Sequence, residues 1–162
     1  MIVFQRPLAA VREGVLARFV ARARRAVGLR GAVTVMITRD REMRLLNKQF
    51  RKKDYPTDVL SFPAVPSGRA LAGDVAISSQ IAARNAKAFG HSTEQEIKIL
   101  ILHGILHLAG YDHEHDQGEM QRKEIRLRQD LGLPVSLIER AEGARGAGQV
   151  GGTKRRPLRR TR

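Results

Sequence analysis

Residues 93–113 read TEQEIKILILHGILHLAGYDH, and this stretch decides the fold. Apolar side chains lie on nearly every side of the helix that it predicts, which is typical of a helix buried at the centre of a domain. Thr93 and Glu96 have the spacing of a capping box at the start of the helix, and Gly110 is a natural residue at its end. We therefore predict a central, buried helix.

Shorter elements of both kinds surround this helix in the sequence. The pattern of apolar residues predicts strands at residues 2–4, 32–38, 59–62 and 74–77, and further helices at 8–27, 40–50, 79–89 and 116–131. Strands in the first half and helices in the second predict the α+β class, with a single small domain, a short mixed β-sheet and about five helices. The central buried helix carries the histidine motif.

Four of the five histidines lie within residues 103–115. His103 and His107 project from one face of the central helix, and the turn at Gly110 can bring His113 back to the same point. A histidine pair at this spacing is more often incidental, but leaving each imidazole unpartnered in an apolar helix costs roughly 1–3 kcal/mol. Three neutral imidazoles with an open fourth position describe a catalytic zinc site. We predict one zinc ion per chain, bound by these three histidines.

The run H-x-x-x-H-x-x-G-x-x-H resembles the zinc signature of metzincin peptidases. The glutamate that acts as general base in those enzymes is Gly104 here, so peptide hydrolysis by that mechanism lacks its base. Of the other histidines, His115 is expected near the rim of the site and His91 at the surface of a loop. The pattern thus favours a metal-dependent hydrolase with another substrate.

The charge of the chain is strongly basic and unevenly placed. It has 30 basic and 16 acidic residues, a net charge of +14. Residues 140–162 hold eight basic residues and one acidic residue, and we predict that they form a disordered basic tail after a metallo-hydrolase domain at residues 1–139. This balance favours a polyanionic partner such as nucleic acid, although a basic surface can also serve solubility alone.

Three classes of protein are disfavoured by composition. The chain has no cysteine, which excludes disulfides and thiolate metal sites. It has no apolar run of about 18 residues, so no membrane span or membrane partner is expected. Its first residues lack the pattern of a secretory signal, and we expect a cytoplasmic protein.

The stretch HGILHLAGYDH at residues 103–113 is similar to the signature of the YbeY family of bacterial endoribonucleases and ribosomal-RNA maturation factors. The blocks NKQFRKKDYPTDVLSFP at 47–63 and GDVAIS at 73–78 resemble further parts of that family, in the same order. The EMQRKE stretch at 119–124 fits its end. The resemblance covers roughly residues 30–133, and the histidine block is specific when it is read together with PTDVLSFP.

The resemblance implies a small α+β fold with the histidine helix at its centre and a zinc ion on the three histidines. It implies a single-strand-specific endoribonuclease that acts in maturation of the 3′ end of 16S ribosomal RNA and in ribosome quality control, with the small ribosomal subunit as partner. An arginine in the second block is important in this family, and Arg51 holds that position here. We therefore expect Arg51 and His103 to be catalytic.

Several nearby residues are candidates for supporting parts in such a site. Arg51, Lys52 and Lys53 form a basic run suited to RNA phosphates, although such a run can also be a solvated loop. Asp58 and Asp112 can orient a ligand histidine from behind, or can simply start a strand and form a turn.

Two other functions remain open from the residues alone. One is a non-catalytic, rRNA-binding ribosome assembly factor in which the zinc is structural. The other is a metallopeptidase with an unconventional base, which Gly104 and the basic charge disfavour.

Overall fold

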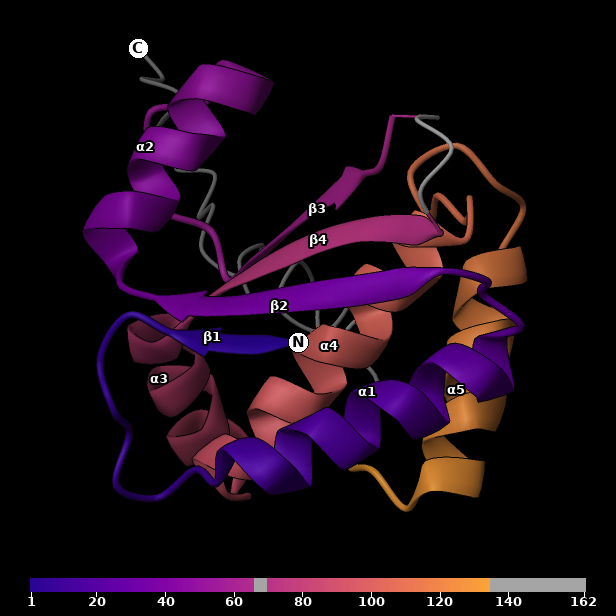
Figure 1. The fold of residues 1–162 in the computed structure, drawn as a ribbon, viewed down its shortest axis with the longest axis horizontal. Helices are drawn as coiled ribbons and strands as arrows, with labels where there is room; N and C mark the ends of the chain where they lie inside the picture. The colour runs from indigo at the N-terminus through magenta and orange to yellow at the C-terminus, as the bar shows by residue number, and fades with distance from the viewer. Residues whose placement is uncertain (66–69, 135–162) are drawn as a thin grey trace, which may run out of the picture.

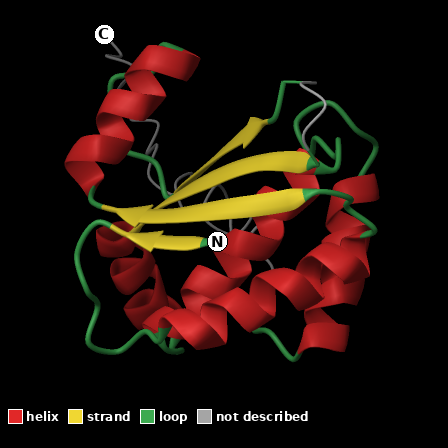
Figure 2. Ribbon diagram, viewed as in Figure 1, coloured by secondary structure: helices red, strands yellow, loops and turns green. Residues whose placement is uncertain are grey.

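The computed structural model describes residues 1–65 and 70–134. These residues form one domain with a single four-stranded sheet and five helices (Figures 1 and 2). The strands are β1 (Ile2–Phe4), β2 (Ala32–Thr38), β3 (Val59–Pro63) and β4 (Leu71–Ser78); the helices are α1 (Glu13–Val27), α2 (Asp40–Arg51), α3 (Ser79–Phe89), α4 (Thr93–Leu108) and α5 (Glu119–Leu131). The predicted α+β class is confirmed. The predicted tail at residues 140–162 lies outside the described residues.

The sheet is mixed, with the strand order β1-β2-β4-β3. β1 pairs parallel to β2 and β2 parallel to β4, whereas β3 pairs antiparallel to β4 and forms one edge. Helices α1, α3, α4 and α5 cover one face of the sheet, and α2 lies on the other face (Figure 1). The edge strand β3 therefore has helices of both layers near it.

Helix α4 occupies the centre of the helical layer, as predicted. Its side chains from Ile99 to Leu106 are all buried, because apolar residues surround the helix axis and both the sheet and the other helices pack against it. The capping box is one residue earlier than predicted. The Ser92 hydroxyl accepts a hydrogen bond from the Gln95 backbone N–H at 3.1 Å, and the Gln95 side chain accepts one from Ser92 N–H at 3.0 Å.

Two predictions around this helix start are wrong for one reason. Glu96 does not take part in a cap: it is fully buried, and its Oε2 lies 2.5 Å from Nε2 of His91. The side chain of His91, predicted at the surface, is only 6% exposed. The carboxylate and the imidazole are hydrogen-bonded to each other, and this bond offsets the free-energy cost of burying both polar groups among apolar residues.

Two helices also begin later than predicted, and β4 begins earlier, at Leu71 instead of residue 74. α1 begins at Glu13 instead of residue 8, because a turn closed by Val11 N–H and Leu8 C=O places Val11 in the core. α5 begins at Glu119 instead of residue 116. Asp116 precedes the helix, and its carboxylate accepts hydrogen bonds from the backbone N–H groups of Gly118 and Met120. None of the helices in the described ranges is both long and apolar enough to cross a membrane.

Candidate active site

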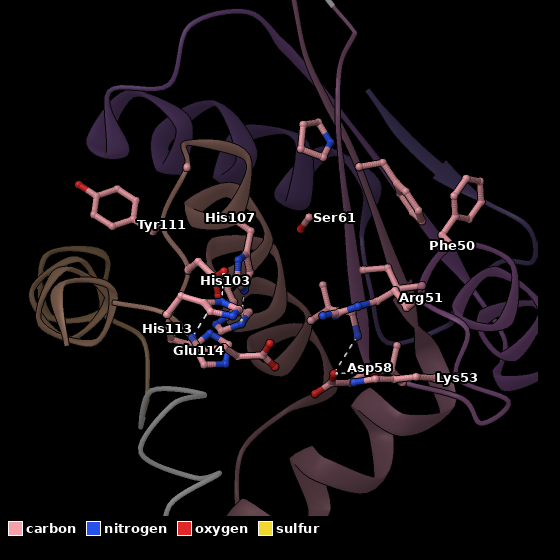
Figure 3. Close-up of a pocket in the computed structure, with 18 of the residues that line it drawn as sticks. Phe50, Arg51, Lys53, Asp58, Ser61, His103, His107, Tyr111, His113 and Glu114 are labelled. Atoms are coloured by element: carbon pink, nitrogen blue, oxygen red, sulfur yellow. Dashed lines mark hydrogen bonds and ion pairs between the residues drawn. The ribbon is translucent and has the colours of Figure 1, made fainter. Parts of the chain in front are cut away.

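The three histidines of the predicted metal site lie together. His103 and His107 come from the last two turns of α4, and Gly110, with a φ of 94°, reverses the chain so that His113 joins them. The Nε2 atoms of His103 and His107 are 3.2 Å apart. The centroid of the His113 ring lies 5.3 Å from the centroid of each of the other two rings. One nitrogen from each ring lies within 4.8 Å of the others, so the group could hold a metal ion. Figure 3 shows the rings turned toward one another.

The protonation of this group suits a metal. Burial, together with the neighbouring imidazoles of His103 and His113, lowers the pKa of His107 to about 4. His107 is therefore neutral at pH 7 and presents a nitrogen lone pair. Clustered imidazole nitrogens are a donor set that zinc and related transition metals prefer. The residues present therefore fit a metal ion.

Glu124 holds the first of these histidines from behind. Its Oε2 lies 3.1 Å from Nδ1 of His103, and both side chains are almost completely buried. An ionised carboxylate can only accept a hydrogen bond, so this contact places the proton of His103 on Nδ1 and leaves Nε2 for the metal. Sequence reasoning missed this role. The available signal was a glutamate at a core position of α5, between the buried residues Met120 and Leu127.

We expect Glu124→Gln to weaken zinc affinity by about 10–100-fold, because the amide keeps the shape of the side chain but removes the charge that orients His103. The affinity is measured by competition with a chelating dye. Glu96→Gln is the matched control, since it changes a second buried glutamate that contacts a histidine, at the other end of α4. Equal zinc affinity in the two variants would contradict a role of Glu124 in zinc binding.

The two aspartates expected behind the ligand histidines have other hydrogen-bond partners. Asp58 Oδ1 accepts from Val59 N–H at 2.8 Å and from the Thr57 hydroxyl at 3.3 Å, and burial raises the pKa of its carboxyl group while the nearby His103 opposes that rise. Asp112 Oδ2 lies 2.7 Å from Nδ1 of His115. This contact lowers the pKa of Asp112 and raises that of His115, an exposed ring at the rim.

A cleft of about 1130 Å³ opens over the three histidines. Its walls come from β3, from the ends of α2, α3 and α4, and from the loop at residues 110–115. Arg51 and Lys53 line it across from the histidines (Figure 3). Within the described part of the chain, neither of these cations forms an ion pair with a carboxylate. The cleft thus joins a possible metal site to two cations available for an anionic ligand.

Lys52 differs from its two basic neighbours. It ends α2 with a φ of 60°, its Nζ donates a hydrogen bond to the Gln49 carbonyl, and it is not among the residues that line the cleft. The left-handed turn at Lys52 separates it from Arg51 and Lys53. Of the basic run, the structure brings the first and third residues into the cleft.

Position 104, where a peptidase would carry its base, has no room for a side chain. A Cβ on Gly104 would lie 2.7 Å from Cγ1 of Val75 and 3.1 Å from the Ser61 hydroxyl oxygen. That hydroxyl donates a hydrogen bond to the Gly104 carbonyl at 3.1 Å. The glycine therefore lets α4 pack directly against β3 and β4, and this packing sets the two helix histidines at the edge of the sheet.

Comparison with known proteins shows the family to which the chain is similar. The family model described as "Endoribonuclease YbeY" matches residues 5–132 of the chain. A protein of that name from Koribacter versatilis is 56% identical over 140 residues, which are 86% of this chain and 91% of the relative. Another from Solibacter usitatus is 50% identical over 141 residues, 87% of this chain and 94% of the relative. The solution structure of TM1509 from Thermotoga maritima has a TM-score of 0.55 and 27% identity, and covers 96% of this chain and 100% of its own.

Proposed function

The chain belongs to the family of the endoribonuclease YbeY, and on this premise we propose that it is a zinc-dependent endoribonuclease specific for single-stranded RNA. Its place would be the cytoplasm, in maturation of the 3′ end of 16S rRNA and in ribosome quality control, with the small ribosomal subunit as partner. The observation that carries the proposal is the cleft itself, because three clustered imidazoles face two cations across it, and these cations have no carboxylate partner among the described residues.

In this proposal His103, His107 and His113 hold the zinc ion. When bound, zinc supplies a Lewis acid for a phosphate oxygen and lowers the pKa of a water molecule. Glu124 keeps Nε2 of His103 directed at the site. His103 would therefore contribute to catalysis by holding the zinc ion in position, while Glu124 fixes the orientation of its ring.

Arg51 lies on the opposite wall of the cleft and would bind the phosphate group of the substrate. Its guanidinium offers a planar pair of donors that matches two non-bridging oxygens of a phosphodiester, and Lys53 adds a second positive charge beside it. Negative charge on those oxygens grows as the phosphorus is attacked, so cations fixed in the cleft stabilise the transition state more than the bound substrate. These residues would thus position the scissile phosphate against the metal site.

Replacing Arg51 with alanine is expected to lower kcat on single-stranded RNA about 100-fold, the typical effect of removing one preorganised donor to developing charge. Arg44→Ala is the matched control, because Arg44 is on the same helix but already forms an ion pair with Asp54 at 2.8 Å. Steady-state cleavage of a labelled oligonucleotide measures both variants. Equal losses in the two would contradict a specific contact between Arg51 and phosphate.

The proposed function is tested on single-stranded RNA, duplex RNA and casein, with and without zinc. We expect zinc-dependent cleavage of the single strand and products without a 2′,3′-cyclic phosphate. Products with a 2′,3′-cyclic phosphate would contradict attack by water, and cleavage of casein would favour a peptidase. RNA binding without metal-dependent cleavage would favour the assembly factor with a structural zinc.

A further inference from the structure

Two half-exposed phenylalanine rings line the same cleft as the histidines. Phe50 is 56% exposed and lies in the last turn of α2, and Phe89 is 49% exposed and is the last residue of α3. The phosphate chemistry proposed for the cleft uses neither of them. Large rings in contact with water beside a polar site offer flat, apolar surfaces for a ligand.

Each ring is held by a neighbouring ring. Phe50 packs edge to face with Phe62 of β3, with centroids 5.0 Å apart and planes at 67°. Phe89 lies parallel to His91, with centroids 6.4 Å apart and planes at 12°, and His91 is itself fixed by Glu96. The orientation of both rings is therefore set before a ligand binds, which reduces the entropy that binding costs.

The two rings come from opposite layers of the fold. α2 lies on one face of the sheet and α3 on the other, and the edge strand β3 runs along the cleft between them (Figure 1). Arg51 follows Phe50 directly in the sequence and lies in the cleft (Figure 3). The cleft therefore presents an aromatic ring from each layer together with the cations and the histidines.

We propose that Phe50 and Phe89 are specificity-determining residues that each stack one unpaired nucleobase of the RNA, on either side of the phosphate bound at Arg51. This inference rests on the proposed function. A base in a duplex is already stacked on both faces and paired at its edge, so it cannot lie on a protein ring without being extruded. Aromatic rings beside cations are the usual means of holding single strands without reading their sequence. The two rings thus give a physical basis for selecting single-stranded RNA.

The test compares Phe50→Leu and Phe89→Leu with wild type, because leucine keeps apolar bulk and removes the stacking surface. Each change is expected to raise KM for a single-stranded oligonucleotide about tenfold and to leave kcat nearly unchanged. Tyr55→Leu is the matched control, since Tyr55 is 54% exposed but does not line the cleft, and its KM should equal that of wild type. The preference for single-stranded over duplex RNA should fall in the two phenylalanine variants alone.

A second substrate separates stacking from a structural effect. In an oligonucleotide with abasic sites on both sides of the cleaved bond, wild type and the two phenylalanine variants should share one KM. If the variants lose as much on the abasic substrate as on the intact one, or match wild type on both, the inference is overturned while the nuclease function stands. If wild-type protein with zinc cleaves no RNA, the proposed function itself fails.

Discussion

His103→Ala is expected to lower kcat/KM for single-stranded RNA by at least about 1,000-fold, because the change removes one of the three proposed ligands of a metal ion whose loss would cost several kcal/mol of transition-state stabilisation. The buried ring also loses its contact with Glu124, which leaves that carboxylate without its imidazole partner. The variant should remain folded but less stable, since the apolar residues of α4 that belong to the core are unchanged. Cleavage rates and thermal unfolding of the same preparation give both readouts.

His115→Ala is the control for this prediction. His115 lies two residues beyond His113, but its side chain is 78% exposed and contacts Asp112. We expect its activity to stay within about twofold of wild type, as for most exposed side chains outside a site. RNA cleavage that survives His103→Ala at the wild-type rate would point to a contaminating nuclease or to a centre elsewhere.

Gly104→Glu is expected to lower the free energy of unfolding by at least about 4 kcal/mol, a large part of the 5–15 kcal/mol typical of a domain. The change restores the sequence H-E-x-x-H, yet the first carbon of the new side chain would already lie 2.7 Å from Val75. Val75 is fully buried and stiff because it is β-branched, so α4 must move away from the sheet or the carboxylate must be buried in it. Urea denaturation followed by circular dichroism measures the loss.

The matched control is Gly14→Glu. Gly14 is an exposed helical residue in the first turn of α1, and a Cβ there would lie 3.5 Å from the Arg18 guanidinium, an ordinary contact. An acidic residue four positions before an arginine, near a helix start, should leave stability unchanged or raise it slightly. A Gly104→Glu protein that is as stable as wild type and cleaves casein would contradict the inference that packing at position 104 excludes the general base of a peptidase.

The parts of the site that lie close together in the sequence could be predicted from it. Four-residue spacing on a helix places His103 and His107 on one face, and a glycine turn returns His113, so local geometry suffices. The same holds for the buried helix α4, because apolar residues on all its sides leave no other place for it.

Contacts between distant segments could not be predicted in the same way. Glu124 reaches His103 across 21 residues, and only the packing of α5 on α4 shows which carboxylate stands behind that ring. Phe89 joins the cleft because the fold brings α3 and β3 to the same cleft, which no local pattern in the sequence reveals. Likewise, the turn at Lys52 decides which members of the basic run face the cleft.

The most direct test of the central claim is the metal content of the purified protein, measured by elemental mass spectrometry after exchange into metal-free buffer. Beside the three histidines, the described residues hold a second group at the surface that could bind an ion, formed by Asp112, Glu114 and His115. We expect one zinc ion per chain in wild type and in His115→Ala, and almost none in His107→Ala. Equal zinc in wild type and His107→Ala, or its loss in His115→Ala, would contradict the three-histidine site.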